Sequence, residues 1–297
     1  MADKAHRLTD EKLEQMEKKL SAIYRRAEKE IGEAWKSYLA ESTKEIDDLQ
    51  KKYNEAKKSG DKNETKKIGK ELSQAKREKT IMDKRFKVLT ETTAAEIANV
   101  NKTALAYING ELPELYALNY NALAEAVDGV GGYMFSLIDA DTVKNLATSD
   151  ESLLPYKELD EKKDIRWNAK KMNAEVLQGI LQGESMDKIG DRLRNVTTMN
   201  AKAAIRNART MVTGAENKGR QDSYARAEAD GIILQKEWLA TNDNRTRHSH
   251  VLLDGDIVDQ NKEFDNGLMF PGDPNGEPSE VYNCRCSMAA VVKGFRK

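Results

Sequence analysis

Two pairs of residues that could bind a metal lie close together near the C-terminus. His248 and His250 are two positions apart, and so are Cys284 and Cys286. If each pair lies on extended chain, both of its members point to the same side. Two imidazoles and two thiolates that face each other could supply a tetrahedral Zn²⁺ site. The alternative is a pair of small buried thiols with exposed histidines, and the spacing leaves both possibilities open.

Charged side chains crowd the same block of sequence, which runs from Trp238 to Cys286. They could form an acid–base or phosphate-binding set, or they could brace turns through salt bridges and side-chain hydrogen bonds. We expect the bracing role, because the block contains no nucleophile with an adjacent base, no Walker loop and no Rossmann fingerprint. These charged residues are Asp243, Arg245, Arg247, Asp254 and Asp256.

We expect this block to be a folding element, and not a catalytic centre. Arg285, beside Asn283 and between the two cysteines, is predicted to pair with Asp243 or Asp254 and so to join the two ends of the block. The segment Pro271–Pro278 is predicted to be a rigid loop. A small core is predicted from six apolar residues: Trp238, Leu252, Leu253, Phe264, Met269 and Phe270.

The composition favours long exposed helices over one large core. Of 297 residues, 33% are charged and 39% are hydrophobic, with a mean hydropathy of -0.75; typical globular chains are more apolar and less charged. The net charge of -1 is no nucleic-acid signature. Residues 1–90, however, contain 24 Lys and Arg against 18 Asp and Glu, a net charge of +6. A basic arm therefore precedes an acidic body.

The number of cysteines and the lack of long apolar runs indicate the compartment in which the protein is made. A single C-x-C pair is no disulfide framework, which favours a reducing compartment. No run of 18 apolar residues and no apolar signal core appear. We expect a soluble protein that is made in a cytoplasm.

The first two-thirds of the chain are predicted to be helical. Apolar residues recur every three or four positions from Leu13 to Leu39, which predicts a helix over residues 8–58. Ser59-Gly60-Asp61 predicts a break, and a second helix over 63–101 would complete an antiparallel hairpin. Gly129–Gly132 is expected to break the chain. Further helices are predicted over 164–181, 186–194 and from about Thr197 to Gly231, the last with a face of small residues that predicts a close neighbour.

The remaining residues are predicted to form a small β-containing module. We expect a strand over 232–239, a hairpin over 251–258 with its turn at Asp254-Gly255, and a strand over 280–292. The fold class is α+β. The expected domains are a helical arm (1–128), a connecting helical region (129–184) and the C-terminal module (185–297). Basic residues of the last long helix could contact phosphates or form a solvated face: Arg192, Arg194, Lys202, Arg206 and Arg209.

An ordered set of motifs in the C-terminal half, over roughly residues 185–290, resembles the phage head morphogenesis family, the Mu F-like minor head proteins of tailed bacteriophages. The set begins with a helix and continues through the charged block to N-C-R-C. Its members are Ala204–Thr210, Ala215–Arg220, Trp238, Asp243–His248 including Arg245 and Arg247, His250, Leu253-Asp254-Gly255, Phe264, Pro271–Pro274 and Asn283-Cys284-Arg285-Cys286.

The resemblance implies a minor structural protein of the phage head that associates with the portal protein during procapsid assembly and assists DNA packaging or delivery. A scaffolding or major capsid protein is a further expected partner. From the basic arm and the Arg192–Arg209 helix we expect at most weak, sequence-independent DNA contact, and from the lack of a long apolar run we expect no membrane contact. The resemblance implies a place in the virion interior, and in the host cytoplasm during assembly. Some relatives carry a toxin domain after this module, and we expect none here because only residues 287–297 follow.

The chain departs from the family where a zinc site would lie. Many members have Cys-x-x-Cys where this chain has Arg247 and His250, and His-Pro where it has Val281-Tyr282. A partial metal site formed by His248, His250, Cys284 and Cys286 is kept as an alternative. Two other functions are considered beside the structural one. They are a metal-dependent hydrolase or nuclease using these residues with Asp254, and a non-specific DNA-binding protein using the basic arm.

Overall fold

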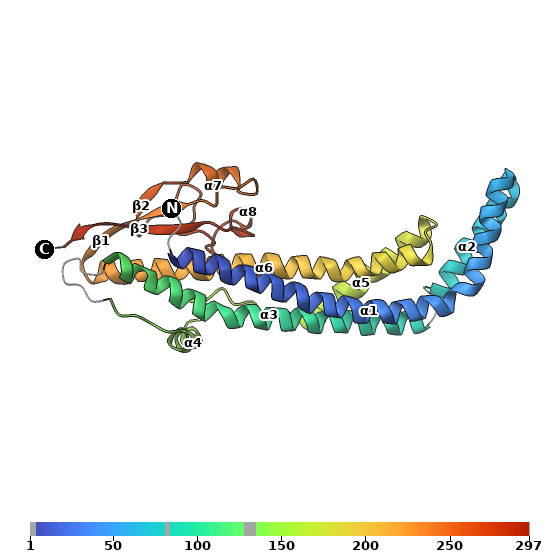
Figure 1. The fold of residues 1–297 in the computed structure, drawn as a ribbon, viewed down its shortest axis with the longest axis horizontal. Helices are drawn as coiled ribbons and strands as arrows, with labels where there is room; N and C mark the ends of the chain where they lie inside the picture. The colour runs from blue at the N-terminus through green and yellow to red at the C-terminus, as the bar shows by residue number, and fades with distance from the viewer. Residues whose placement is uncertain (1–3, 81–83, 128–134, 297) are drawn as a thin grey trace. The chain divides into compact units, whose positions relative to one another are not determined.

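The computed structural model describes residues 4–80, 84–127 and 135–296 and confirms the α+β class (Figure 1). Long helices make up most of the chain, and a small sheet lies in its C-terminal part. No described helix combines the length and the apolar character that a membrane span requires. The elements in chain order are α1 (Lys4–Ser59), α2 (Lys62–Thr80), α3 (Lys84–Val127), α4 (Ala140–Ser149), α5 (Glu161–Leu181), α6 (Met186–Ala229), β1 (Ile232–Leu239), α7 (His248–Leu252), β2 (Ile257–Asp259), α8 (Pro278–Val281) and β3 (Ser287–Phe295).

The apolar stripe of α1 is buried by the chain's own helices. Eight of its members are at most 7% exposed: Leu13, Met16, Leu20, Tyr24, Ala27, Ile31, Trp35 and Tyr38. Ala34, which was counted in the stripe, is exposed, and the side chain of Leu39 lies outside the described residues. Burial on this scale explains why so charged a helix is stable, since packing of an apolar face contributes more than helix propensity.

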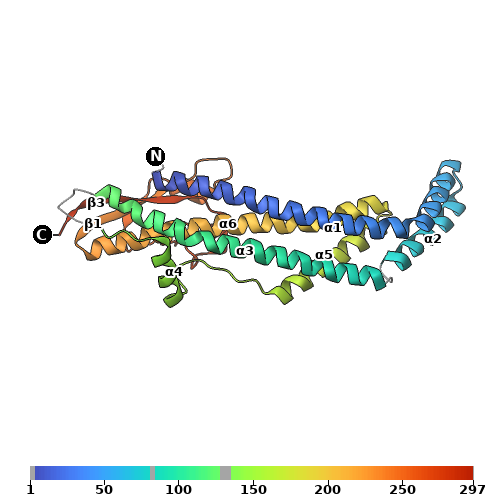
Figure 2. The same ribbon diagram turned by 60° about the horizontal axis from the view of Figure 1, so that its bottom comes forward.

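The predicted hairpin is present between α1 and α2. Gly60 has a φ of 77°, which favours glycine, and Asp61 accepts hydrogen bonds from the amides of Asn63 and Glu64 at the start of α2. The two helices are antiparallel, because Gly69 of α2 lies against Tyr53 of α1. Both views show α2 alongside the end of α1 (Figure 2). The predicted second helix over 63–101 is present as α2 and α3, and residues 81–83 between them lie outside the described residues.

The chain divides into two compact units, each assembled from separate segments. We call residues 20–104 and 159–203 the hairpin-bearing unit, and residues 1–19, 105–158 and 204–297 the sheet-bearing unit. The linear domains 1–128, 129–184 and 185–297 remain a prediction. The expected break at Gly129–Gly132 lies outside the described residues.

Aromatic and aliphatic side chains form the core of the hairpin-bearing unit. Trp35 packs edge-on against Phe86, with ring centroids 5.7 Å apart, and its indole nitrogen donates to Thr93. Met172, Val176 and Ile180 of α5 pack into the same core. Trp167 of the same helix is 49% exposed, because it lies five residues before Met172 and points to another side of α5.

The sheet-bearing unit is built on the second half of α6. The strand order is β2-β1-β3, and both pairings are antiparallel. The expected close neighbour of α6 is α3: a Cβ on Gly219 would lie 2.5 Å from the carbonyl oxygen of Tyr116. The predicted separate helices over 186–194 and from Thr197 are one continuous helix, α6, because the Thr197 region has no helix-breaking residue.

Two predicted β elements are wrong. Residues 248–252 form the short helix α7, and only Ile257–Asp259 of the expected hairpin is a strand. The strand expected over 280–292 begins only at Ser287 as β3. Pro278 starts the one-turn helix α8, and Asn283 has a φ of 61°, which interrupts extended chain before the cysteines.

Candidate functional site

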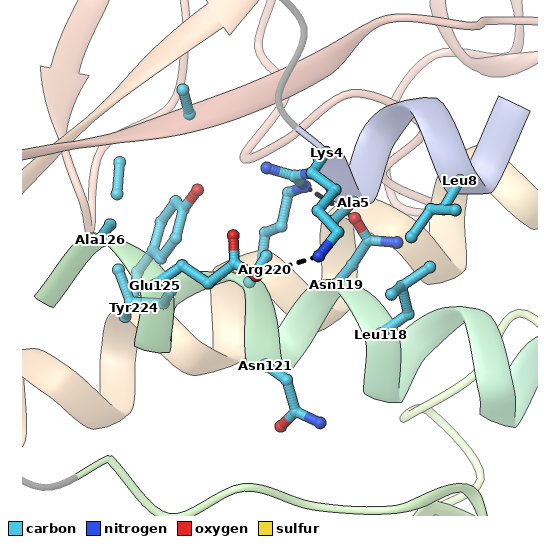
Figure 3. Close-up of a pocket in the computed structure, with 14 residues that line it drawn as sticks. Lys4, Ala5, Leu8, Leu118, Asn119, Asn121, Glu125, Ala126, Arg220 and Tyr224 are labelled. Atoms are coloured by element: carbon cyan, nitrogen blue, oxygen red, sulfur yellow. Dashed lines mark hydrogen bonds and ion pairs between the residues drawn. The ribbon is translucent and has the colours of Figure 1, made fainter. Parts of the chain in front are cut away.

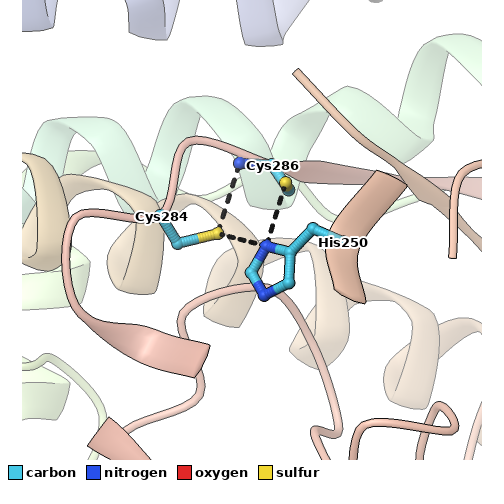
Figure 4. A group of neighbouring side chains, drawn as sticks. All are labelled: His250, Cys284 and Cys286. Atoms are coloured by element: carbon cyan, nitrogen blue, oxygen red, sulfur yellow. Dashed lines mark hydrogen bonds between the residues drawn. The ribbon is translucent and has the colours of Figure 1, made fainter. Parts of the chain in front are cut away.

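Three of the four predicted metal ligands form one buried cluster (Figure 4). His250 lies on α7, and Cys284 and Cys286 lie between α8 and β3; none is more than 2% exposed. The Nδ1 atom of His250 is 3.6 Å from Sγ of Cys284 and 3.4 Å from Sγ of Cys286. His248 is exposed and outside the cluster. It lies on the same helix as His250, where a two-residue step turns a side chain by about 200°.

Two polar residues of α6 fix the cysteine segment. Thr213 donates to the carbonyl of Cys284 at 2.7 Å, and Asn217 donates to the carbonyl of Cys286 at 3.1 Å. Both donors are buried and are one helical turn apart. From the sequence, this face of α6 was predicted only as a face of small residues. The i, i+4 pair of polar residues within that face was the signal that could have indicated a buried hydrogen-bonding role.

Glu280 orients the imidazole, and this role was not predicted from the sequence. Its Oε2 lies 2.9 Å from Nε2 of His250, and the hydroxyl of Ser249 donates to the same oxygen at 3.0 Å. A proton on Nε2 donates to this carboxylate and leaves the Nδ1 lone pair directed at the two sulfurs. A carboxylate on the far nitrogen of a ligating histidine is a common feature of metal sites.

The two thiols differ in their affinity for protons. Hydrogen bonding from Cys284 lowers the pKa of Cys286 to about 5. Hydrogen bonding with Cys286, together with burial, raises the pKa of Cys284. At neutral pH the cluster therefore holds one thiolate, which is the form of cysteine that binds metals.

The donor set fits Zn²⁺ in chemistry and in dimensions. Typical Zn–S and Zn–N bonds and tetrahedral angles place a sulfur and a nitrogen ligand about 3.6 Å apart. The two sulfur–nitrogen distances, 3.6 and 3.4 Å, are close to this value. Three protein ligands leave one position for another donor.

An aromatic wall covers the cluster. Trp238 meets His250 edge-on, with ring centroids 5.1 Å apart, and meets Phe264 in the same manner at 5.1 Å. Leu253, Leu268 and Val281 complete this core. Three members of the predicted core lie elsewhere: Leu252 is 68% exposed, whereas Met269 and Phe270 pack with Tyr224 in a neighbouring core. Leu252 points outward because residues 248–252 are helical rather than extended.

The charged residues of the block brace its loops, as expected. Arg285 forms two hydrogen bonds with the Asp243 carboxylate, at 2.7 and 2.8 Å, and so confirms one of its two predicted partners. Asp254 instead accepts from the amide of Ala240 and the side chain of Asn242. Arg245 donates its amide to Asp243, and Arg247 donates to the carbonyl of Tyr282. Gly255 donates to the carbonyl of Trp238, and the amide of Trp238 donates to the carbonyl of Asp256. Asn283 accepts from Arg209, and Pro271 precedes Gly272, which lies against Gly214.

A second buried polar cluster joins the start of α1 to α6. Nδ1 of His6 is 2.7 Å from Oε1 of Glu216, and Ser287 donates to the same oxygen at 2.8 Å. Arg220, 2% exposed, donates to Asn119 of α3 and to the carbonyl of Met288. Figure 3 shows Arg220 and Asn119 beside a hollow of about 460 Å³, across which Lys4 and Glu125 form an exposed ion pair. This cluster was not predicted from the sequence.

Comparison with known proteins gives a family match for the part of the chain that contains the site. Residues 170–289 match the family described as Phage Mu protein F like protein. The chain is 27% identical over 287 residues to the minor head protein GP7 of Bacillus phage SPP1, which covers 95% of this chain and 87% of that protein. No solved structure matches.

Two further relatives match over a shorter length. The NAD(+)–arginine ADP-ribosyltransferase EFV of Enterococcus faecalis is 34% identical over 129 residues, which cover 43% of this chain and 26% of that protein. The uncharacterized protein YqbB of Bacillus subtilis is 27% identical over 136 residues, 43% of this chain and 44% of that protein. The chain thus spans about a quarter of the first relative and less than half of the second. Residues 170–289 are thus similar to the Mu F-like family, and the similarity to a phage minor head protein extends over 95% of the chain.

Proposed function

We propose that this chain is a non-enzymatic minor component of the head of a tailed phage and that it binds the portal protein during assembly. The observation that carries the proposal is the similarity to a minor head protein over 95% of the chain. This similarity includes the helical segments outside the family match. A shared enzyme domain would not require them, whereas an assembly protein uses such helices to bind partners.

The apolar stripe of α1 is buried within the chain and is therefore not available to a partner. A different exposed stripe lies on α5, where Trp167, Ala174 and Leu181 recur every seven residues, with Leu177 between them. Trp167, Leu177 and Leu181 are 49%, 45% and 76% exposed. Seven-residue spacing of apolar positions is typical of a seam that packs against another helix.

A hollow beside this stripe supports the same conclusion. It has a volume of about 770 Å³ and is lined by Phe86 and Thr90 of α3 and by Leu177 and Leu181 of α5, among others. The buried Oγ1 of Thr90 has no hydrogen-bond partner among the residues that the structure describes. An exposed apolar groove of this kind suits an amphipathic helix, and we propose that a helix of the portal protein occupies it.

The test is binding of the purified full-length chain to the portal oligomer of its own phage. Leu177→Asp with Leu181→Asp should reduce co-elution at least tenfold and leave the melting temperature within a few degrees of wild type. The matched control is Leu146→Asp, at a leucine of α4 that is 50% exposed, and it should bind like wild type. Failure of the wild type to bind the portal at any salt would contradict the proposal.

We further propose that His250, Cys284 and Cys286 hold a structural zinc ion that stabilises the C-terminal module. The sulfur–nitrogen distances, the Glu280 carboxylate behind His250 and the full burial of the ligands support a structural role over a hydrolytic one. A catalytic zinc needs a position that substrate can reach, whereas these ligands lie beneath Trp238 and Phe264.

The metal content of the purified chain tests this second proposal. Wild type should contain about one zinc per chain, and Cys284→Ser with Cys286→Ser should lose it and melt at a lower temperature. His248→Ala is the matched control and should keep both the metal and the stability. If the wild type is metal-free after purification and after added Zn²⁺, the zinc proposal fails, while the portal proposal stands.

A further inference from the structure

Lysine side chains line a hollow at the turn of the α1–α2 hairpin. The hollow has a volume of about 590 Å³, and Lys57 of α1 lines it together with Lys62, Lys66 and Lys70 of α2. Its other lining residues are uncharged: Tyr53, Gly60, Thr65, Gly69 and Ser73. All four lysines are exposed. The hollow therefore presents positive charge to the solvent and no negative charge from its own wall.

The hairpin holds these lysines in a regular row. Lys62, Lys66 and Lys70 follow one another at intervals of four residues, which places them on one face of α2 with a rise of about 6 Å per step. Asp61 caps the first turn of α2, so the row begins on a fixed helix end. A Cβ on Gly69 would lie 3.1 Å from the Tyr53 ring, so α1 and α2 are closely packed beside the row.

The four lysines form no ion pair within the described part of the chain. Several basic residues that were predicted to contact phosphates are, in contrast, already paired. Arg192 binds Glu184 and Glu175, and Arg194 binds Asp191. Arg209 binds Glu17 with two hydrogen bonds. These three arginines are therefore poorer candidates for phosphate contact than the hairpin lysines, whereas Lys202 and Arg206 of α6 are exposed.

The charge of the whole unit agrees with this local pattern. The hairpin-bearing unit contains 29 Lys and Arg against 22 Asp and Glu, a net charge of +7. The sheet-bearing unit contains 20 against 28, a net charge of -8. The balanced net charge of the chain thus conceals two units of opposite sign. A polyanion would be attracted to the first unit and repelled by the second.

We propose that the lysine-lined hollow binds the backbone phosphates of duplex DNA without sequence preference. A row of point charges at regular spacing suits a regular line of phosphates. Contacts to phosphates carry no information about the base sequence. The proposal does not depend on portal binding, because its lysines lie on α1 and α2, whereas the exposed leucines of the proposed portal groove lie on α5, although Ser73 of α2 lines both hollows.

Protein and membrane partners fit this surface less well. The exposed large hydrophobic side chains of the described chain include none between residues 47 and 76. A protein interface has an apolar core that is depleted in lysine, and a membrane-surface helix buries an apolar face. Single-stranded DNA is bound on stacked aromatic rings, whereas the hollow offers only the half-buried Tyr53.

Fluorescence anisotropy with a short labelled DNA duplex tests the proposal on the full-length chain. The site variant carries Lys62→Gln, Lys66→Gln and Lys70→Gln. The control carries Lys51→Gln, Lys52→Gln and Lys58→Gln, which removes the same charge from exposed positions of the same hairpin outside the hollow. Melting curves should show both variants folded as wild type, since exposed substitutions of this kind change stability little.

We expect the site variant to bind the duplex at least tenfold more weakly than wild type at about 50 mM salt, and the control less than threefold more weakly. The slope of log affinity against log salt should fall by up to about 2.7 in the site variant, about 0.9 for each lost phosphate contact. Equal weakening in both variants, or no binding by wild type, would overturn the site. Tighter binding to single-stranded DNA or to polyglutamate than to duplex DNA would overturn the assigned ligand.

Discussion

The two units use charged side chains in opposite ways. In the sheet-bearing unit, His6, Glu216 and Arg220 are buried, and each contacts a polar group from a distant part of the chain. In the hairpin-bearing unit the core is mostly apolar, and lysines such as Lys66 are exposed and have no ion-pair partner among the described residues. A buried charge must be paired, because its desolvation is costly, and so it fixes the fold. An exposed, unpaired charge contributes little to stability and is available to a partner.

Lysines give the same contrast within one residue type. Lys236 is fully buried in the sheet-bearing unit, where its ammonium donates to the carbonyl of Met269 at 2.6 Å. Burial lowers the pKa of Lys236 to about 8. The four lysines of the hollow remain in water. Lys76 of the hairpin-bearing unit is an exception, since it is buried and donates to the carbonyl of Glu184 at 2.8 Å. We conclude that His6, Glu216, Arg220 and Lys236 help to specify the fold of the sheet-bearing unit, whereas the four lysines of the hollow are available for binding.

Replacing Arg220 should have the largest effect on stability. Arg220→Met leaves the side-chain oxygen of Asn119 and the carbonyl of Met288 without a donor, and it removes the positive charge beside Glu216. Breaking such a buried set costs about 3–5 kcal/mol, measurable by urea unfolding. The matched variant on the same helix is Arg194→Met, whose pair with Asp191 is exposed and which should cost less than about 1 kcal/mol. Equal losses in the free energy of unfolding for Arg220→Met and Arg194→Met would contradict the difference between buried and exposed charges.

The His6–Glu216 contact should make stability depend on pH. Burial alone lowers the pKa of His6, but the charge and hydrogen bond of Glu216 outweigh it and raise the pKa to about 9. The folded state therefore binds the proton more tightly than the unfolded state. The resulting stability is fully present below about pH 6.5 and is lost as pH rises through about 9.

Melting temperatures between pH 6 and 10 check this prediction. Wild type should lose up to about 3 kcal/mol over that range from this contact. His6→Gln should lose less over the same range, because the glutamine does not titrate. The two curves should therefore converge at high pH. Parallel curves would show that His6 carries no extra proton in the folded state.

Replacing Arg285 should have a smaller effect that disappears in acid. Hydrogen bonds from Arg285 hold the pKa of Asp243 well below its usual range. The stability from this pair is present above about pH 4 and is lost as pH falls through the lower folded pKa. Arg285→Ala should lower the melting temperature at pH 7, and the difference from wild type should shrink below pH 4. Arg245→Ala, at a more exposed contact of the same aspartate, should change it less.

The smallest effect is expected from the lysine row. Lys66→Ala should change the free energy of unfolding by no more than about 0.5 kcal/mol, because the side chain is exposed and unpaired. Urea unfolding of this single variant and of Arg220→Met compares the loss in free energy of unfolding at an exposed charge with the loss at a buried charge. A loss above about 1 kcal/mol would mean that Lys66 has a structural contact and would weaken its assignment to ligand binding.

Local patterns in the sequence predicted the elements whose signals are themselves local. The stripe of α1, the turn at Gly60 and the strand β1 all follow from short-range periodicity and are present. The pairing of Arg285 with Asp243 was also predicted, since the two residues frame one compact block. The α7 helix was missed because a short apolar run has no period that separates helix from strand, and packing of His250 and Leu253 against Trp238 decides it.

The site was predicted only in part for a related reason. His250, Cys284 and Cys286 were identified by residue type and spacing, but His248 was included because an extended chain was assumed. Glu280 was missed because nothing in its local sequence marks it as a partner of a histidine 30 residues away. The His6–Glu216 contact joins residues 210 positions apart. Such contacts depend on tertiary packing, and a single sequence does not display them.

The most direct test of the account is the protein content of assembled particles. Heads should be purified from infections in which the phage carries wild type, Leu177→Asp with Leu181→Asp, or Leu146→Asp, and this chain and the portal quantified by mass spectrometry. We predict that the chain is present in a fixed ratio to the portal in wild-type and Leu146→Asp heads. It should be lost from heads of the double variant, although that variant is folded in the cell. Absence of the chain from wild-type heads and from their procapsids would contradict the account.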